Sequence, residues 1–330
     1  MENILVSVIM ANYNTPIEYL KEAIDSVLAQ TYTNFEFIII DDASTDSSLS
    51  VINSYKDPRI NLIVNDENIG LTKSLNKAIS ISRGKYIARM DSDDVSLPQR
   101  FSRQVDYMEE HSNVIVCGTW FEKFGEENRI RKPVIPSTEY YRCQLLFSDT
   151  PITMCHPSTF IRKSMLDQYN IRYDESIKKA QDYNMWVECS RYGEMAILNE
   201  VLLRYRTHKK QISLDKQDEQ YYYARLISRR QLQGLEIDYQ VGEDRWRYDL
   251  VVNRDDYISF YEWLIRISEN NRKIGYLNQN ALDLYNDQKL SKALKRIKKP
   301  ELIKIYCCSN QHTRILVRSL IKNAIKKRLL

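Results

Sequence analysis

Glycine is scarce in this chain, and its placement excludes a common way of binding phosphate. Only eight of the 330 residues are glycine, and they form neither a GxG pattern nor the spacing of a P-loop. Backbone amides of a glycine-rich turn therefore cannot cradle phosphates in the usual way. A nucleotide bound here would need a metal ion to balance its phosphate charge.

Cysteine pairs, long apolar runs and an N-terminal signal are also missing. The six cysteines show no CxxC spacing, so neither a disulfide framework nor a zinc site is predicted. No eighteen consecutive residues are apolar and no basic segment precedes the first apolar run, so neither a membrane span nor secretion is predicted. With 43% apolar residues and a length of about two domains, the chain is expected to be globular and cytoplasmic.

Positive charge is concentrated in one part of the sequence. Residues 291–330 contain twelve Lys or Arg and one acid, Glu301. This tail has a net charge of +11, and because the whole chain has +4, the rest carries −7. Such a tail favours an anionic neighbour, either a membrane surface or a nucleic acid.

Strand-like and helical patterns alternate in the first half of the chain. The β-rich apolar segments are residues 4–10, 35–40, 60–64, 85–90 and 114–118. Between the first two, apolar residues recur at helical spacing, and Thr15 with Glu18 is expected to form a capping box with Pro16 at the first helical position. The alternation predicts an α/β fold with a mostly parallel, Rossmann-like sheet covered by helices.

Polar side chains follow three of the predicted strands. Ala11 to Asn14 follow the first strand, Asp41 and Asp42 the second, and Asp91, Asp93 and Asp94 the fourth. Ligands of parallel sheets bind outside the carboxyl ends of the strands. These residues are therefore expected to lie together at this edge of the sheet, called the rim below, and to form a binding site.

The aspartates after the fourth strand favour a metal ion. Two carboxylates about 5 Å apart repel each other by roughly 3 kcal/mol at a surface-like dielectric constant, and a bound dication turns this into attraction. Mg²⁺ or Mn²⁺ suits such oxygen ligands and can also bind a diphosphate. An EF-hand loop beginning at Asp91 is excluded because its sixth position holds Ser96 instead of glycine. Alternatively, one or two of the aspartates only cap the helix announced by Pro98.

Seven segments in a fixed order resemble the bacterial glycosyltransferase family 2 enzymes, which have the GT-A fold. They are VSVIMANYN, FIIIDDASTD, NIGLTKSLNKAI, GKYIARMDSDDVSLPQRF, HPSTFIRKS, QDYNMW and YRTHKKQIS, within about residues 4 to 213. The resemblance implies an inverting enzyme that moves a sugar from a nucleotide diphosphate, usually UDP, to a hydroxyl group. It also implies that Ala11 and Tyr13 flank the uracil, Asp42 hydrogen-bonds it, Asp91 lies by the ribose and Asp93 binds the metal.

Two positions depart from the family pattern. Leu75 stands where the family often has arginine, so Lys73 is expected to supply a cation to the diphosphate or the uracil. Gln181 stands before Asp182, where the family commonly has glutamate. The charged partner is lost, but the aspartate is kept.

Asp182 is the expected catalytic base. Inverting transfer requires one positioned carboxylate that takes the proton of the attacking hydroxyl. The dipole of the helix expected from residue 182 onward would keep this carboxylate ionised, and the alternative is that Asp182 only caps that helix. Trp186, four positions on, is expected in the core.

Two histidines, His208 and His156, are candidate site residues with different expected roles. By the resemblance, His208 follows the last strand of the catalytic domain and reaches the metal or the diphosphate, for which a neutral imidazole is a suitable ligand. The alternative is a surface histidine among Arg206, Lys209 and Lys210. His156, before Pro157, is expected to shape the acceptor loop.

Helical patterns dominate after residue 214. The segment 314–330 combines an apolar face with basic residues, so it is either an interfacial helix or a helix packed on the body. We expect a catalytic domain over residues 1–214 and a helical accessory region over residues 215–330, with a tail that associates with an anionic membrane.

The predicted activity is transfer of a hexose, galactose or glucose, from a UDP-sugar to a lipid-linked sugar. The expected acceptor is undecaprenyl-diphosphate-linked GlcNAc or GalNAc, in O-antigen or capsule synthesis at the inner face of the cell membrane. One alternative is a sugar-nucleotide-binding module without catalysis, against which Asp91, Asp93 and Asp182 argue together. The other is a nucleic-acid-binding protein, which the acidic rim and the lack of a recognised nucleic-acid module disfavour.

Overall fold

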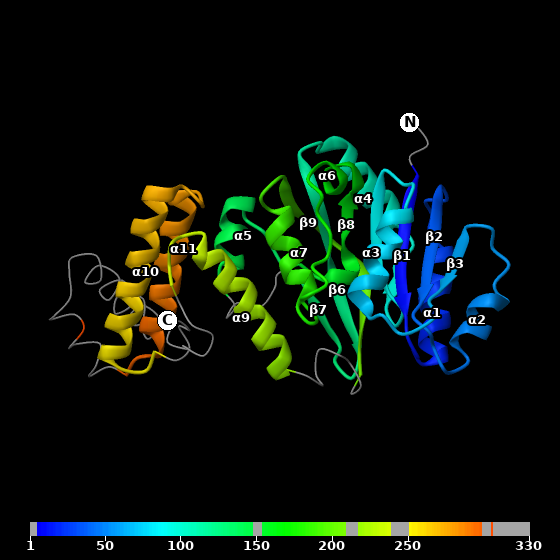
Figure 1. Ribbon diagram of the computed structural model, residues 1–330, viewed down its shortest axis with the longest axis horizontal. Coiled ribbons are helices and arrows are strands. Elements are labelled where there is room, and N and C mark those ends of the chain that lie inside the picture. The colour runs from blue at the N-terminus through cyan, green and yellow to red at the C-terminus, as the bar shows by residue number, and fades with distance from the viewer. Residues whose placement is uncertain (1–4, 148–153, 209–216, 239–250, 299–304, 306–330) are drawn as a thin grey trace, which may run out of the picture. The chain divides into compact units, whose positions relative to one another are not determined.

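The structure is a computed structural model that describes residues 5–147, 154–208, 217–238, 251–298 and 305. The chain divides into two compact units (Figure 1). The first comprises residues 1–141 and 151–224, and the second comprises residues 142–150 and 225–330. Of the cysteines in the described residues, Cys117, Cys155 and Cys189 are free thiols.

A mixed sheet forms the centre of the first unit. Four strands pair in parallel in the order β3-β2-β1-β4, and they are β1 (Val6–Asn12), β2 (Phe35–Asp41), β3 (Ile60–Val64) and β4 (Tyr86–Asp91). All residues of β2 are buried, as expected for a strand covered on both faces. The prediction of an α/β fold with a mostly parallel sheet is confirmed.

The sheet continues beyond β4 with shorter and mixed pairings. The further strands, in sheet order, are β8 (Phe160–Arg162), β6 (Val114–Gly125), β9 (Glu194–Thr207) and β5 (Val95–Ser96), with β7 (Arg129–Arg131) paired to β6. β6 and β9 pair in parallel, whereas β8, β7 and β5 pair antiparallel to their neighbours. β9 therefore links the body of the sheet to β5, which follows the aspartates.

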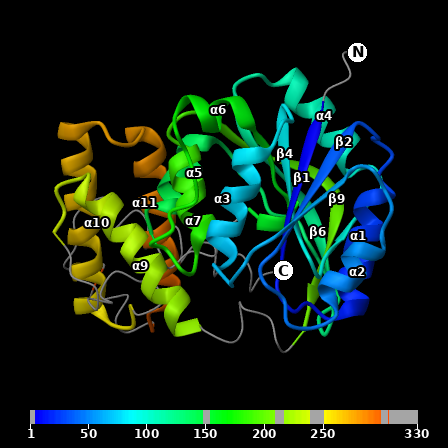
Figure 2. The ribbon, with the colours of Figure 1, turned by 45° about the vertical axis from the view of Figure 1, so that its right-hand side comes forward.

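Helices cover both faces of the parallel strands. On one face α1 (Ile17–Leu28), α2 (Ser48–Ser54) and α4 (Arg100–Glu110) bury their apolar sides against Val6, Val8 and Met10. The other face is covered by α3 (Leu71–Ile81) (Figure 2), which buries Leu75, Ala78 and Ile79. Further helical segments of this unit are η1 (His156–Ser158), α6 (Lys163–Gln168) and α7 (Gln181–Cys189).

The expected capping box of the first helix is wrong. Helix α1 begins at Ile17, its N-cap is Pro16, and no side chain caps it. The Thr15 hydroxyl instead lies 2.7 Å from the Ser92 hydroxyl. A contact across 77 residues has replaced the local one, which ties the loop after β1 to the turn that carries the aspartates.

The second unit is helical. It contains α10 (Arg254–Ile274), α11 (Gln279–Arg296), most of α9 (Gln217–Gln233) and the end of α5 (Thr138–Leu145). Phe147 packs against Trp263 and Tyr285, with ring centroids 5.4 Å apart in both pairs. None of the helices in the described residues is both long and apolar enough to cross a membrane. The predicted tail helix, 314–330, lies outside the described residues.

Candidate active site

Strand register brings the polar residues of the rim together. In the pairing of β1 with its two neighbours, Ala11 lies opposite Asp91 of β4, and Asn12 lies opposite Asp41 of β2. Because parallel strands end at the same edge, the loops after all three strands meet there. These loops form the candidate site.

The loops after β1 and β2 are fixed to each other by hydrogen bonds. Buried Asp41 accepts hydrogen bonds from Asn12 Nδ2 at 2.8 Å and from Ser44 Oγ at 2.7 Å. Asn14 has a positive φ of 51°, and its Oδ1 accepts the Thr45 N–H at 2.8 Å. Tyr13, between these anchored residues, is 50% exposed and is available for stacking.

Asp42 organises the segment that leads into α3. Its carboxylate accepts hydrogen bonds from Asn65 Nδ2 at 2.7 Å, from the Ile69 N–H at 3.0 Å and from the Gly70 N–H at 2.8 Å. A carboxylate has about four acceptor positions, so capacity for a further donor remains. Lys73 is exposed near the start of α3.

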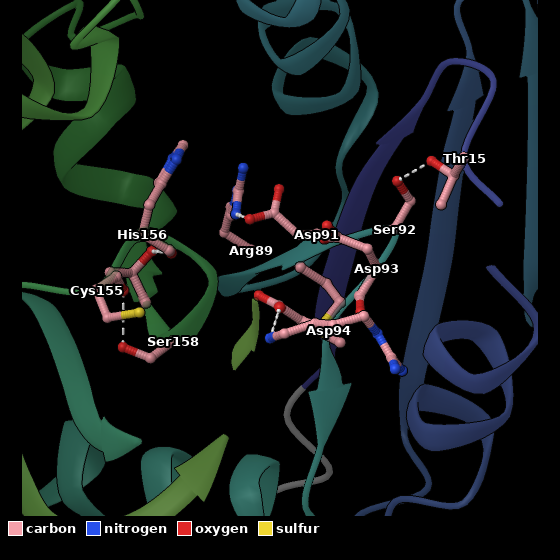
Figure 3. Close-up of polar contacts among 12 residues, drawn as sticks. Thr15, Arg89, Asp91, Ser92, Asp93, Asp94, Cys155, His156 and Ser158 are labelled. Atoms are coloured by element: carbon pink, nitrogen blue, oxygen red, sulfur yellow. Dashed lines mark hydrogen bonds and ion pairs between the residues drawn. The ribbon is translucent and has the colours of Figure 1, made fainter. Parts of the chain in front are cut away.

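The aspartates at the end of β4 converge. One carboxylate oxygen from each of Asp91, Asp93 and Asp94 lies within 4.8 Å of the other two (Figure 3). Asp94 is fully buried, and its Oδ1 accepts the Arg206 N–H at 2.8 Å. Its Oδ2 is buried without a hydrogen-bond partner, which normally costs free energy.

The electrostatics of this acidic triad favour a bound cation. Burial, followed by repulsion from Asp91, raises the pKa of Asp93, and burial with repulsion from Asp93 and Asp91 raises the pKa of Asp94 well above its usual range. Oxygen ligands at this spacing, one of them lacking a partner, suit a hard divalent ion. The residues present therefore fit Mg²⁺ or Mn²⁺.

His208 lies against the acidic triad but is not part of it. It follows β9, and its Nε2 is 3.0 Å from Asp93 Oδ2. Its ring centroid is 5.6 Å from that of Tyr19 on α1. The structure thus brings His208 to Asp93, the two residues that the sequence analysis selected as metal ligands.

Asp182 lies in the first turn of α7 rather than at its cap. The N-cap is Ala180, with a left-handed φ of 57°, and Asp182 Oδ1 accepts the Tyr183 N–H at 2.8 Å. Burial raises the pKa of Asp182, the Tyr183 N–H opposes this, and the nearby charges of Arg89 and Asp91 also act on it. Trp186 is fully buried, as predicted.

His156 is a core residue near this helix. Its Nε2 is 2.7 Å from the Tyr173 hydroxyl, and its ring lies edge-on to Trp186. Burial lowers the pKa of His156 well below its usual range, so the ring is neutral. Its hydrogen bond holds the segment around Tyr173 in place.

Two arginines at the site were missed in the sequence analysis. Arg89 is only 2% exposed, and its Nη1 lies 2.5 Å from Asp91 Oδ2 (Figure 3). A cation within the apolar strand "YIARMD" is a signal that could have identified it. Arg206 contacts both Asp93 and Asp94, and no local pattern marks it, because its partners are more than 110 residues away.

Comparison with other proteins is consistent with this geometry. Residues 7–169 match the family described as glycosyl transferase family 2. An uncharacterised glycosyltransferase of Methanocaldococcus jannaschii is 36% identical over 229 residues, which are 68% of this chain and 78% of the relative. WfaP of Escherichia coli, a UDP-Glc:α-D-GlcNAc-diphosphoundecaprenol β-1,3-glucosyltransferase, is 43% identical over 105 residues, 32% of this chain and 41% of that protein.

Solved structures show the same fold at low sequence identity. Residues 1–349 of Staphylococcus aureus TarS, crystallised with UDP-GlcNAc, superpose with a TM-score of 0.57 at 15% identity, covering 95% of this chain and 78% of that one. The mannosyltransferase PcManGT of Pyrobaculum calidifontis, in complex with GDP-Man and Mn²⁺, gives 0.51 at 15% identity, covering 97% and 80%. The chain belongs to glycosyltransferase family 2, has a GT-A-like fold and acts on sugar nucleotides.

Proposed function

We propose that the protein is an inverting, metal-assisted hexosyltransferase that moves galactose or glucose from a UDP-sugar to a lipid-linked sugar. The observation that carries this proposal is the acidic triad, whose three carboxylates converge within 4.8 Å at the rim of a family 2 sheet. Three like charges repel one another, and a bound cation would turn this repulsion into attraction.

The donor nucleotide is assigned to the loops after β1 and β2. Ala11 and Tyr13 flank the uracil. Asp42 accepts a hydrogen bond from the uracil at an acceptor position that its three intramolecular hydrogen bonds do not use. Asp91 lies by the ribose, and Lys73 supplies positive charge from α3. The rigid contacts of Asp41 and Asn14 with neighbouring loop residues hold this surface in shape before the donor binds.

The divalent cation is assigned to Asp93, with His208 as a second ligand. When bound, Mn²⁺ or Mg²⁺ stabilises the negative charge that develops on the leaving diphosphate. Asp93 and His208 are already 3.0 Å apart, so little rearrangement is needed to hold the ion. Arg89 pairs with Asp91 and so keeps that carboxylate oriented beside the ion.

Asp182 is assigned as the catalytic base. In a single displacement the acceptor oxygen forms a bond to the anomeric carbon while the bond to the diphosphate breaks, and the hydroxyl proton passes to Asp182. The raised pKa of Asp182 makes it a better proton acceptor. Arg89, whose charge opposes that rise, favours the ionised form that the reaction needs.

The acceptor and the pathway are proposed from similarity and charge. WfaP acts on a diphosphoundecaprenol-linked GlcNAc, and we extend a related acceptor, undecaprenyl-diphosphate-linked GlcNAc or GalNAc, to this chain. Residues 1–214 would hold donor and acceptor, and residues 215–330 would be an accessory region. Its basic tail would hold the enzyme on the inner face of the cell membrane, in O-antigen or capsule synthesis.

A donor screen tests the proposal. Purified protein is mixed with individual UDP-, GDP- and dTDP-sugars, with Mn²⁺ or with EDTA, and nucleotide release is measured with and without a synthetic lipid-diphosphate GlcNAc or GalNAc. We expect release from UDP-glucose or UDP-galactose that needs the metal and rises with acceptor. Release only from a GDP-sugar, or undiminished release in EDTA, would contradict the assignment.

A further inference from the structure

Arg206, near the end of β9, makes contacts that no other feature of the proposed mechanism explains. Its Nε donates a hydrogen bond to the Asp93 carbonyl oxygen at 2.7 Å, and its backbone N–H donates to Asp94 Oδ1 at 2.8 Å. Its Nη2 pairs with Glu22 of α1. One residue therefore binds two members of the acidic triad and an adjacent helix.

The Arg206 guanidinium is also fixed by packing. It contacts two aromatic rings, at 4.1 Å from the centroid of Tyr19 and 4.4 Å from the centroid of Phe124. The residue is 8% exposed. A buried guanidinium that packs on two rings has little rotational freedom, so it keeps the direction of its Nε donor.

These contacts bear directly on the carboxylates. The bond to the Asp93 carbonyl fixes the backbone from which the Asp93 side chain reaches His208 at 3.0 Å. The backbone bond to Asp94 Oδ1 leaves Oδ2, the atom without a partner, for another ligand. Repulsion among the three carboxylates would otherwise spread them apart when no cation is present.

We propose that Arg206 is a positioning residue that holds the acidic triad in its cation-binding arrangement and joins it to α1. The inference rests on the proposed metal assistance and deepens it. Arg206 touches neither the substrate nor the cation in this assignment. Its side chain acts through Asp93 and His208, and its backbone N–H, which the substitutions below keep, acts through Asp94.

The chain provides a matched control in Arg204, two residues earlier on β9. Arg204 also pairs with a glutamate, Glu122 at 2.9 Å, and its guanidinium lies 4.3 Å from the centroid of the same Phe124 ring. Its ion pair joins β9 to β6 and includes none of the aspartates. Replacing either arginine by methionine removes one ion pair and the contact with the Phe124 ring. Only the substitution at residue 206 also removes a contact to the acidic triad and the contact with the Tyr19 ring.

The experiment measures the affinity for Mn²⁺ alone, without donor or acceptor, by electron paramagnetic resonance of the full chain. We expect R206M to raise the Mn²⁺ Kd by about tenfold or more, the usual effect of removing a residue that orients metal ligands. R204M should leave the Kd unchanged. R206K should have an intermediate effect, because one ammonium group cannot reproduce the fork that contacts both Asp93 and Glu22.

Each outcome decides between structural and positioning roles. A folded R206M that binds Mn²⁺ like the native protein overturns the inference, as does an equal loss in R204M. If R206M does not fold, R206K decides, because native affinity in that variant also overturns it. Failure of the native protein to bind Mn²⁺ would instead contradict the proposed metal assistance itself.

Discussion

Single carboxylates carry the chemistry proposed for this site, and their surroundings separate their roles. Asp93 lies in a cluster of like charges with a histidine beside it. Asp182 lies at the start of a helix, and its carboxylate accepts the Tyr183 N–H. In the proposed mechanism the first environment would bind a cation and the second would favour proton transfer, so substitutions at the two residues should impair different steps.

Asp182→Asn should separate catalysis from binding. The amide keeps the size of the side chain but cannot accept the proton of the acceptor hydroxyl, so kcat should fall by about 10²–10⁴-fold. UDP affinity, measured by calorimetry, should stay near that of the native protein. A large loss of UDP affinity with an unchanged kcat would mean that Asp182 belongs to the donor site and is not the base.

Asp93→Ala should remove the cation site. Loss of this ligand should abolish measurable Mn²⁺ binding and lower transfer by several orders of magnitude, as EDTA should for the native enzyme. Asp66→Ala is the control, since Asp66 is an exposed acid outside the triad. Full transfer activity of the Asp93 variant in chelator would contradict metal assistance.

At the scale of secondary-structure elements, the ends of β6 and β9 meet beside His208. Gly125 ends β6 with a φ of +98°, and a Cβ built on it would lie 2.5 Å from the Thr207 carbonyl oxygen. Only glycine fits here, because the backbone conformation and the close approach both exclude a side chain. The partner strand then runs directly into His208.

Gly125→Ala should therefore destabilise the first unit, by about 1–3 kcal/mol from the backbone conformation alone. Gly70→Ala is the matched control, because Gly70 also has a positive φ, of +88°, but no atom within 4 Å of the added Cβ. Urea denaturation of both variants should show the larger loss for Gly125. An equal loss would show that the contact with Thr207 relaxes freely.

Helix capping is the corresponding element-scale feature of the second unit. Asn253 forms a capping box at the start of α10, where its side chain accepts the Asp256 N–H at 2.9 Å and Asp256 accepts the Asn253 N–H in return. Asn278 caps α11 through one bond, from the Ala281 N–H at 3.1 Å.

Asn253→Ala should cost about 1 kcal/mol of unfolding free energy, and Asn278→Ala should cost a similar amount, because each substitution removes one side-chain bond to a helix N–H. The reciprocal bond to Asp256 uses the Asn253 backbone N–H and survives the substitution. Denaturation followed by circular dichroism measures both. No loss at either position would mean that these side-chain caps add nothing to stability.

At the scale of the whole molecule, the charge asymmetry suggests where the enzyme works. Seven Lys or Arg follow Pro300 in the sequence, and each contributes about 1 kcal/mol near an anionic leaflet. This attraction acts over a Debye length of about 8–10 Å. A lipid-diphosphate acceptor keeps its sugar within that range of the membrane.

Truncation after Pro300 should release the protein from anionic liposomes and raise KM for long-chain lipid acceptors. Metal-dependent hydrolysis of the UDP-sugar should stay intact, since the proposed donor residues all lie before residue 209. Liposome sedimentation at low and high salt measures the first effect. If the truncated protein unfolds, the tail is a structural part of the fold. If it still binds liposomes at high salt, another segment anchors the protein.

The sequence alone determined the fold class and the residues that line the rim. Each depends on short-range pattern: a strand is an apolar run of a few residues, a helix is a 3.6-residue period, and parallel strands end at one edge. For this reason Ala11, Asp42, Asp91 and Asp93 could be selected before any contact was known. The same reasoning placed Trp186 in the core.

Only the tertiary structure decided how the rim is held together. Thr15 could have capped its own helix, but the neighbouring turn offered Ser92, 77 residues away. Arg206 reaches Asp93 and Asp94 because β9 lies between β6 and β5 in the sheet, an order that sequence period does not encode. The buried guanidinium of Arg89 pairs with the Asp91 carboxylate. Local pattern fixes which residues face an edge, whereas strand order and register fix which of them touch.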